Sequence, residues 1–135
     1  MDMDIPLQTC YQIYVFLINI ATVLIAYYVC KKMSQNVNIS LIGSFLYLMS
    51  APRLVNLYTR SAVGEYTATT FFPLILYGLY LVYSEKKEDT NKGWLPLALG
   101  MSAVVMSHVI SFEISLIVVG GICVLNLKKT LSLVS

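Results

Sequence analysis

Both arginines of the chain, Arg53 and Arg60, lie in one short stretch that also contains Glu65. Guanidinium groups bind phosphate oxygens through paired N–H donors, so this stretch predicts a binding site for a phosphate or diphosphate. Arg53, Asn56 and Arg60 recur at helical spacing, which indicates a short interfacial helix with both arginines on one side. We expect this helix to stop at Gly64. Contacts with lipid headgroups, or an ion pair with Glu65, are the simpler alternatives.

Four further residues are candidates for a pocket around the arginines: Tyr58, Glu65, His108 and Glu113. Glu65 has the chemistry of an acid or base, or simply of a carboxylate at a helix start. His108 is the single histidine, and a structural hydrogen-bonded role competes with a ligand role. Two possible ligands do not make a metal site, so we expect no metal and no cofactor. The sequence assigns no catalytic residue.

These groups stand out because most of the chain is apolar. Hydrophobic residues make up 58% of the sequence, charged residues 12%, and the mean hydropathy is +0.74. Soluble domains contain about 45–50% apolar residues. The composition therefore predicts an all-α, polytopic integral membrane protein in which charges cluster between the spans. A net charge of +2 is too small to indicate a nucleic-acid partner, and no nucleotide-binding glycine loop is present.

The apolar runs predict a bundle of about five transmembrane helices, each needing about 20 residues to cross a bilayer. We expect the spans at about 10–30, 37–52, 66–83, 94–108 and 112–127. As one helix, residues 94–127 would be about 51 Å long, well beyond a hydrocarbon core of about 30 Å. We therefore place a tight turn at 108–111, with Ser111 as the N-cap and Glu113 in the first turn of the last helix.

The distribution of lysines predicts the orientation. With five spans, one face of the membrane carries seven lysines: Lys31, Lys32, Lys86, Lys87, Lys92, Lys128 and Lys129. The other face carries only the two arginines, so the positive-inside rule makes the lysine face cytoplasmic. We expect a multi-pass protein of the cell membrane with its N-terminus outside and its C-terminus in the cytoplasm. The candidate site residues then share the extracytoplasmic face.

A pattern of residues extends on both sides of the arginines: Tyr47, Pro52-Arg53, Leu57-Tyr58-x-Arg60-x-Ala62-x-Gly64-Glu65-x-x-Ala68 and Pro73-Leu74. It resembles a recurrent block in large bacterial multi-spanning proteins labelled as 6-pyruvoyl-tetrahydropterin-synthase-related, which are similar to GT-C-type glycosyltransferases. The span that ends in Ser107-His108 is also similar to theirs. The resemblance covers roughly residues 10–125, and its motif lies between 47 and 74.

The resemblance implies a fold of many transmembrane helices whose external loops handle a polyprenyl-phosphate-linked sugar. Arg53 and Arg60 would contact the lipid phosphate. In GT-C enzymes an acidic residue in the loop after the first span usually acts as base. No span precedes Asp2 and Asp4, so the catalytic acid is not carried over to any position. The further spans and the soluble domain of such proteins are missing too, and we expect a fragment of a longer protein that is inactive alone.

Two alternatives belong to other functional classes. In a transporter or flippase element, Pro73 and Gly78 would mark broken helices around a site at mid-membrane. In a small accessory protein, the pair Gly120-Gly121 would pack against other transmembrane helices. The expected partners are membrane lipids, a polyprenyl-phosphate sugar and other transmembrane helices, and not nucleic acid.

Overall fold

The computed structural model describes residues 6–84 and 87–134, with side chains for 6–84 and 92–133. Within these ranges the chain is all helical and contains no strand, which confirms the predicted all-α class. The elements are α1 (Leu7–Ser34), α2 (Val37–Leu48), α3 (Ala51–Leu54), the π-helix η1 (Val55–Thr59), α4 (Val63–Val82), α5 (Lys87–Ser107), α6 (Val109–Leu125) and α7 (Leu127–Val134).

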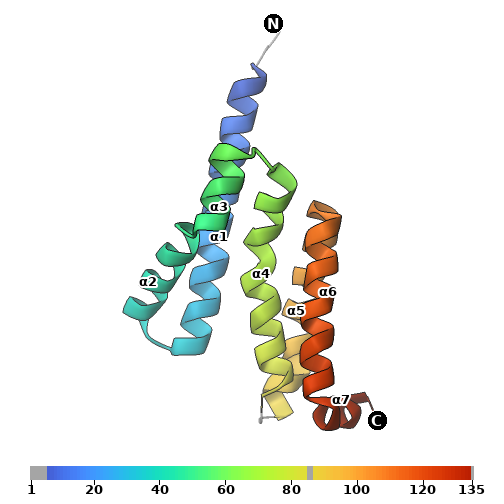
Figure 1. Cartoon of the computed structure of the whole chain (residues 1–135). Coiled ribbons are helices and arrows are strands. Elements are labelled where there is room, and N and C mark those ends of the chain that lie inside the picture. The colour runs from blue at the N-terminus through green and yellow to red at the C-terminus, as the bar shows by residue number, and fades with distance from the viewer. Residues whose placement is uncertain (1–5, 85–86, 135) are drawn as a thin grey trace, which may run out of the picture.

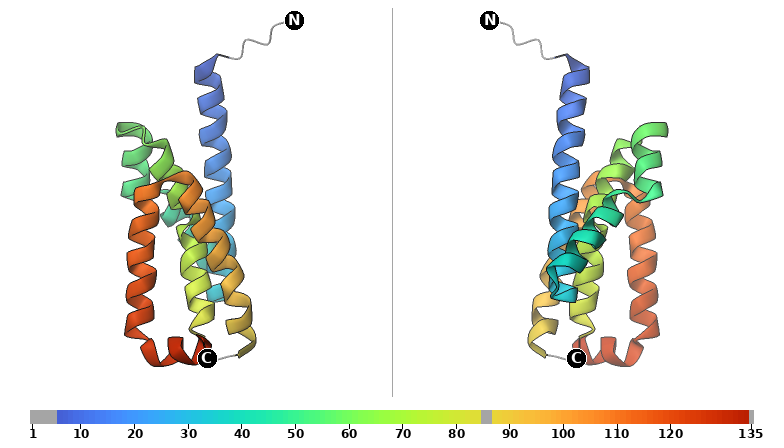
Figure 2. Two further views of the ribbon diagram at one scale, coloured as in Figure 1. Left: turned by 90° about the vertical axis from the view of Figure 1, so that its right-hand side faces the viewer. Right: turned by 90° about the vertical axis from the view of Figure 1, so that its left-hand side faces the viewer.

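Helix α4 lies at the centre of the bundle and packs mainly on α5, and also on α1 (Figures 1 and 2). Helix α2 runs back along α1 after a turn at Gln35, which adopts the left-handed conformation with φ 55°. The α1–α2 turn, the start of α5 and α7 lie toward one end of the bundle. The η1–α4 connection and the α5–α6 turn lie toward the other, so the connections alternate between two ends.

The helices overlap all five predicted spans, but only some of these helices have the length and composition that a membrane span requires. Among the described residues, α1 is the one helix that is long and apolar enough to cross a bilayer by itself. Helices α6 and α7 qualify only as a pair, and that pair is bent by 96°. Helix α2 is apolar but has 12 residues. Length and composition therefore indicate one span, or two, and do not by themselves establish five.

The turn between α5 and α6 is shorter than predicted. His108 alone interrupts the helices, in an extended conformation, and its side chain accepts a hydrogen bond from the amide of Ser111. The predicted N-cap at Ser111 is therefore wrong, because an imidazole nitrogen satisfies the amide that a hydroxyl normally satisfies. Ser111 is instead buried inside the first turn of α6, and Glu113 lies beyond that turn.

The arginine segment is not a regular amphipathic α-helix. After the single turn of α3 the chain widens into η1, where the amide of Arg60 donates to the carbonyl of Val55 at 3.0 Å. The segment ends at Ser61, which has φ 49°, and not at Gly64. In a π-helix each amide bonds to the carbonyl five residues earlier, so the angle between successive side chains differs from that of an α-helix. The two arginines therefore do not share a side: Arg53 is 2% exposed, whereas Arg60 is exposed.

Glycines allow α4 and α5 to approach closely. A Cβ atom on Gly78 would lie 2.5 Å from the backbone nitrogen of Leu97 and 2.7 Å from its Cα. Similar clashes would occur at Gly93 and Gly100. Helix α4 continues through Pro73 and Gly78, and both residues are buried, so these two positions do not break the helix. Small residues at a helix interface are typical of packing between membrane helices.

Replacing Gly78 by alanine is expected to destabilise the protein by about 1–3 kcal/mol, since the clashing atoms belong to the backbone of α5 and overpacking cannot be relieved by a side chain. Gly121→Ala is the matched control, because nothing lies within 4 Å of a Cβ atom there. It is expected to be neutral, or stabilising by up to about 1 kcal/mol through helix propensity. Thermal unfolding in detergent, followed by circular dichroism, compares the two. Equal stabilities of both variants would contradict this packing.

Candidate functional site

The candidate site is built around Arg53, which is buried although it is charged. Helix α3 begins after Ser50, which is extended, and Pro52 occupies the first turn, where its missing N–H costs nothing. The amide of Arg53 donates to the carbonyl of Ser50 at 3.1 Å. This tight start places the side chain of Arg53 against α4, where its partners are found.

Five residues form what we call the Arg53 cluster: Arg53, Tyr47, Tyr66, Thr69 and Thr70. The guanidinium carbon lies 4.4 Å from the centre of the Tyr66 ring. Nη1 donates to Oγ1 of Thr69 at 3.1 Å and to Oγ1 of Thr70 at 3.4 Å. The Thr69 hydroxyl donates to the carbonyl of Tyr66 at 2.7 Å, and the Tyr47 hydroxyl donates to the carbonyl of Thr69. Thr69 is thereby fixed as an acceptor toward Arg53.

The direction of the hydroxyl bonds makes Thr70 an acceptor as well. Thr22 on α1 donates its hydroxyl proton to the carbonyl of Ile18 at 2.7 Å. The contact of 2.9 Å between Thr22 and Thr70 therefore uses the proton of Thr70. The lone pairs of Thr70 remain for Arg53. Both threonine hydroxyls consequently act as acceptors toward the guanidinium, because their protons are donated elsewhere.

Only one side of the guanidinium is satisfied by these contacts. Within the described part of the chain, Nε and Nη2 of Arg53 are buried and have no hydrogen-bond partner. These two atoms form one edge of the planar group, with parallel N–H bonds. That edge is the one that binds two oxygens of a phosphate or carboxylate side by side. The cluster thus holds Arg53 by Nη1 and leaves a bidentate edge unused.

The charge of Arg53 is not balanced by a described carboxylate. Among the described side chains, Glu65 pairs with Arg60 at 3.4 Å, and Glu113 is exposed on α6. The Tyr66 ring contributes a cation–π interaction of about 2 kcal/mol when desolvated. Burying an unpaired ion costs several kcal/mol. The geometry therefore favours binding of an anion at the free edge.

The remaining predicted site residues lie outside this cluster. Arg60 and Glu65 form the ion pair that was the simpler alternative, with side-chain exposures of 61% and 27%. Tyr58 is 78% exposed and lines a separate open cavity of about 300 Å³ together with residues of α1. Arg53 and Arg60 share no partner among the described residues. The predicted pair of arginines is thus divided between a buried and an exposed environment.

The η1–α4 connection and the α5–α6 turn do meet, although His108 has a structural task. A Cβ atom on Gly64 would lie 2.9 Å from the carbonyl oxygen of Ser107 and 3.1 Å from Cδ2 of His108. The start of α4 therefore touches the α5–α6 turn. Nδ1 of His108 caps α6 and also contacts the Ser111 hydroxyl at 3.0 Å. Among the described residues, no three His, Cys, Asp or Glu side chains are grouped as metal ligands.

Sequence reasoning missed the polar side chains that join α1 to α4. Three pairs of hydrogen-bonded residues connect the helices: Tyr14 and Thr67, Asn19 and Tyr66, Thr22 and Thr70. The signal was visible, because Asn19 and Thr22 interrupt the first apolar run. Polar residues inside a membrane helix commonly bond across to a neighbouring helix.

Comparison with known proteins gives no family model, no curated protein and no solved structure that matches this chain.

Proposed function

We propose that the chain is part of a multi-spanning, GT-C-like membrane protein in which Arg53 binds the phosphate of a polyprenyl-phosphate-linked sugar. The observation that carries this proposal is the buried guanidinium whose Nε and Nη2 lack partners. Phosphate is a suitable ligand, since it offers paired oxygens and the charge that the cluster lacks. We take the class of substrate, a polyprenyl-linked sugar, from the resemblance of the motif around Arg53 to GT-C-like proteins.

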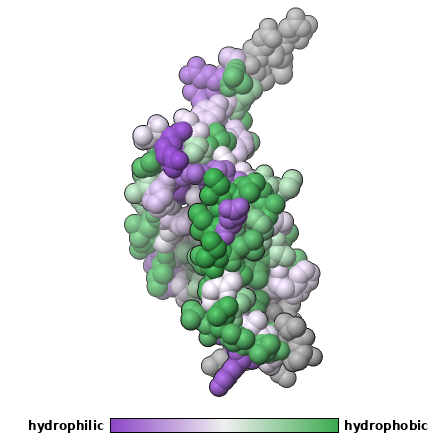
Figure 3. All heavy atoms as spheres, turned by 45° about the vertical axis from the view of Figure 1, so that its right-hand side comes forward, coloured by the Kyte–Doolittle hydropathy of each residue, from purple (hydrophilic) through white to green (hydrophobic). Residues whose placement is uncertain are grey.

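The surface of the helices supports a location in the membrane. The apolar window of α1 is only 17% buried inside the protein, unlike the core helix of a soluble domain. Large apolar residues on α6 also point outward, with Ile117 74% and Leu125 85% exposed. Hydrophobic residues cover much of the face seen in Figure 3. Exposed apolar surface on this scale marks a protein that meets lipid or other helices.

The arrangement of the connections supports the proposed orientation. The arginine segment and the α5–α6 turn lie toward one end of the bundle, and the ends that carry Lys32 and Lys129 lie toward the other (Figure 1). With the lysine end in the cytoplasm, the Arg53 cluster faces the extracytoplasmic half of the membrane. We infer five spans on this basis, with the N-terminus outside.

Access to Arg53 requires a local movement, because the guanidinium is covered. The segment that follows it, η1, has exposed residues at Val55, Tyr58 and Thr59, and none of its residues is buried. π-helical turns are frequent at functional sites. We propose that an outward shift of η1 admits the phosphate, with Arg60 as an outer contact at the rim. The lipid chain would then lie along the apolar surface of α1.

Binding of a polyprenyl monophosphate to the purified protein in detergent tests the proposal, with the polyprenol of equal length as the uncharged ligand. The wild type is expected to prefer the monophosphate. Arg53→Lys keeps the charge but loses the bidentate edge, and we expect roughly a 10- to 100-fold weaker affinity from the lost charged hydrogen bonds. Arg60→Lys keeps the charge of the exposed rim contact, and we expect it to change the affinity by only about twofold. Equal binding of polyprenol, or equal effects of both variants, would reject the proposal.

A further inference from the structure

Helix α7 lies across one end of the bundle, the end at which α4 and α6 terminate (Figures 1 and 2). It is bent by 96° from α6, so it runs nearly at right angles to that helix. A helix at this angle does not continue a span, and it follows the plane in which the spans end. One side of α7 therefore meets the bundle, and the other sides meet the surroundings of the protein.

Polar side chains fix α7 on the end of α4. The ammonium of Lys129 donates to the carbonyls of Tyr83 at 2.6 Å and of Ser84 at 2.9 Å. These carbonyls follow the last residue of α4, where a helix leaves acceptors unpaired and where its dipole is negative. The hydroxyls of Thr130 and Tyr83 share a further hydrogen bond of 2.9 Å. Lys129 and Thr130 therefore define the face of α7 that meets α4.

Two leucines of α7 lie on a different face and point away from the protein. Leu127 and Leu131 are one turn apart, and each is more than half exposed. In a helix that packs on a protein in water, the apolar face meets the protein and the lysines meet the solvent. Helix α7 has the reverse arrangement, because Lys129 is turned inward and these leucines are turned outward. We therefore expect the surroundings of the leucines to be apolar.

Polar residues flank this row of leucines. Lys128 and Ser132, again one turn apart, are both exposed. Helix α7 thus presents an apolar row and a polar row beside the face that is bonded to α4. Apolar and polar residues are separated more sharply in α7 than in the longer helices α1, α4 and α6. An amphipathic helix with leucines on one face and lysine on another is typical of helices that lie in the membrane interface.

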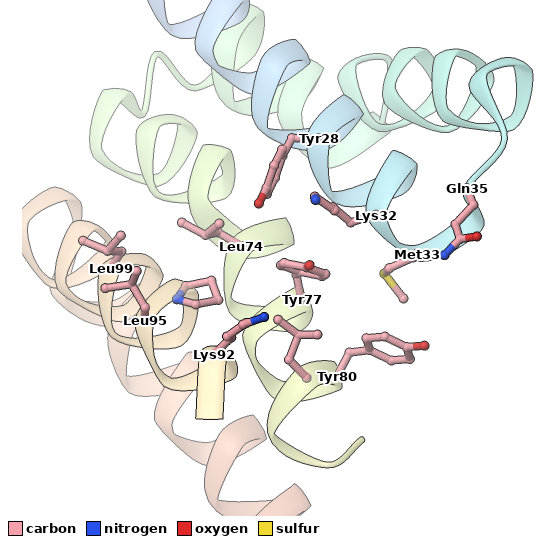
Figure 4. A pocket seen from close by; sticks show the side chains of 12 residues that line it. Tyr28, Lys32, Met33, Gln35, Leu74, Tyr77, Tyr80, Lys92, Leu95 and Leu99 are labelled. Atoms are coloured by element: carbon pink, nitrogen blue, oxygen red, sulfur yellow. The ribbon is translucent and has the colours of Figure 1, made fainter. Parts of the chain in front are cut away.

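Other residues at this end of the bundle mark the level of the interface. Tyr28, Lys32 and Tyr80 lie around a cavity of about 690 Å³ between α1, α4 and α5 (Figure 4). Both tyrosines are exposed, and Nζ of Lys32 lies 5.8 Å from the centre of the Tyr28 ring. Tyrosine and lysine are enriched where membrane helices leave the hydrocarbon core. Tyr83, to which α7 is bonded, lies about one helical turn beyond Tyr80, so α7 lies close to the same level.

We infer that α7 lies in the membrane interface, with Leu127 and Leu131 among the upper acyl carbons of the lipid and Lys128 at the level of the headgroups. Helices of this kind insert their apolar face about 5–10 Å into the boundary between headgroups and acyl chains. Lipid matches both rows, since it offers hydrocarbon to the leucines and phosphate to the lysine. The inference rests on the membrane location in the proposed function, and it is independent of anion binding at Arg53.

Quenching of tryptophan fluorescence in nanodiscs tests this orientation. W94F removes the single tryptophan of the chain, and L131W, L127W or S132W then places one on the leucine row or on the polar row. Phosphatidylcholine brominated on the upper acyl carbons quenches tryptophan that touches lipid, whereas iodide quenches tryptophan in water. L131W and L127W should lose most of their emission to the brominated lipid and little to iodide. S132W is the matched control on the neighbouring row, and it should show the opposite order.

Three results would overturn the inference. Equal iodide quenching of L131W and S132W would place the leucine row in water. Protection of L131W and L127W from both quenchers would show that protein covers the row, as a second copy of the chain or another helix would. Equal quenching of L131W and S132W by the brominated lipid would show that α7 is embedded on all sides. Far-UV circular dichroism checks that each variant keeps its helix content.

The outcome separates this inference from the proposed function. A chain that does not enter nanodiscs would contradict the membrane location, and both proposals with it. A chain that enters nanodiscs and binds polyprenyl phosphate through Arg53, but leaves L131W open to iodide, would contradict the interfacial helix alone.

Discussion

Replacing Arg53 by methionine is expected to raise the stability of the ligand-free protein by about 1–4 kcal/mol, although it changes a residue that is only 2% exposed. Most substitutions of buried residues destabilise. Among the described residues, the buried guanidinium has no partner for Nε and Nη2 and no carboxylate beside it. Methionine is flexible and apolar, and it fills much of the same space without that desolvation cost. Functional sites often cost stability, so a stabilising Arg53→Met would support the ligand-binding role that we propose for Arg53.

The measurement is the apparent unfolding midpoint in detergent, without and with a polyprenyl monophosphate. Ligand should stabilise the wild type and leave Arg53→Met unchanged, because only the wild type has the bidentate edge. Arg60→Met is the control at an exposed position, where we expect a change within about 0.5 kcal/mol. Breaking a satisfied buried ion pair costs about 3–5 kcal/mol of unfolding free energy. If Arg53→Met lowered the stability by that amount, Arg53 would be purely structural.

Replacing both Thr69 and Thr70 by valine is expected to destabilise the protein by about 2–5 kcal/mol. Valine keeps the shape of threonine but removes the oxygens that accept from Nη1 of Arg53. All five N–H groups of the guanidinium would then be buried without a partner, and each orphaned polar group costs about 1–3 kcal/mol. Thr70 also bonds to Thr22 across to α1, so the helix pair loses a contact as well.

A double-mutant cycle isolates the part of this loss that belongs to the guanidinium. In an Arg53→Met background the same two valines should cost less than about 2 kcal/mol, since removing both partners of a hydrogen bond is nearly neutral. Thr67→Val is the single-site control, because Thr67 bonds to Tyr14 at an exposed position, and we expect a loss below about 1 kcal/mol. Equal costs of the valines in both backgrounds would contradict the assigned hydrogen bonds.

The long helices were predictable because each requires a continuous apolar run bounded by charge or by a turn. Lys31 and Lys32 mark the end of α1, and the excessive length of residues 94–127 indicated the break that occurs at His108. These features depend on local composition and on the length of a helix. The alternation of the connections also predicted that the η1–α4 connection and the α5–α6 turn lie toward the same end of the bundle, where the structure brings them into contact.

The environment of Arg53 was not predictable, because it depends on backbone geometry and on tertiary packing. A helical period of 3.6 placed Arg53 beside Arg60, and the π-helix after α3 removes that period. The partners of Arg53 come from a different helix, where Thr69 and Thr70 read as ordinary polar residues at the start of a span. The N-cap formed by His108 was also not predicted, because histidine is uncommon among N-cap residues.

Nitrogen-15 NMR of the arginine side chains tests most directly whether the free edge of Arg53 binds an anion. The chain has only two arginines, Arg53 and Arg60, so a sample labelled at arginine gives two Nε–H signals, which Arg60→Lys assigns. Adding a polyprenyl monophosphate should move the Arg53 Nε–H proton downfield as it forms a hydrogen bond, whereas polyprenol should leave it in place. An Arg53 signal that does not respond to saturating monophosphate, or that responds equally to polyprenol, would contradict the proposed anion site.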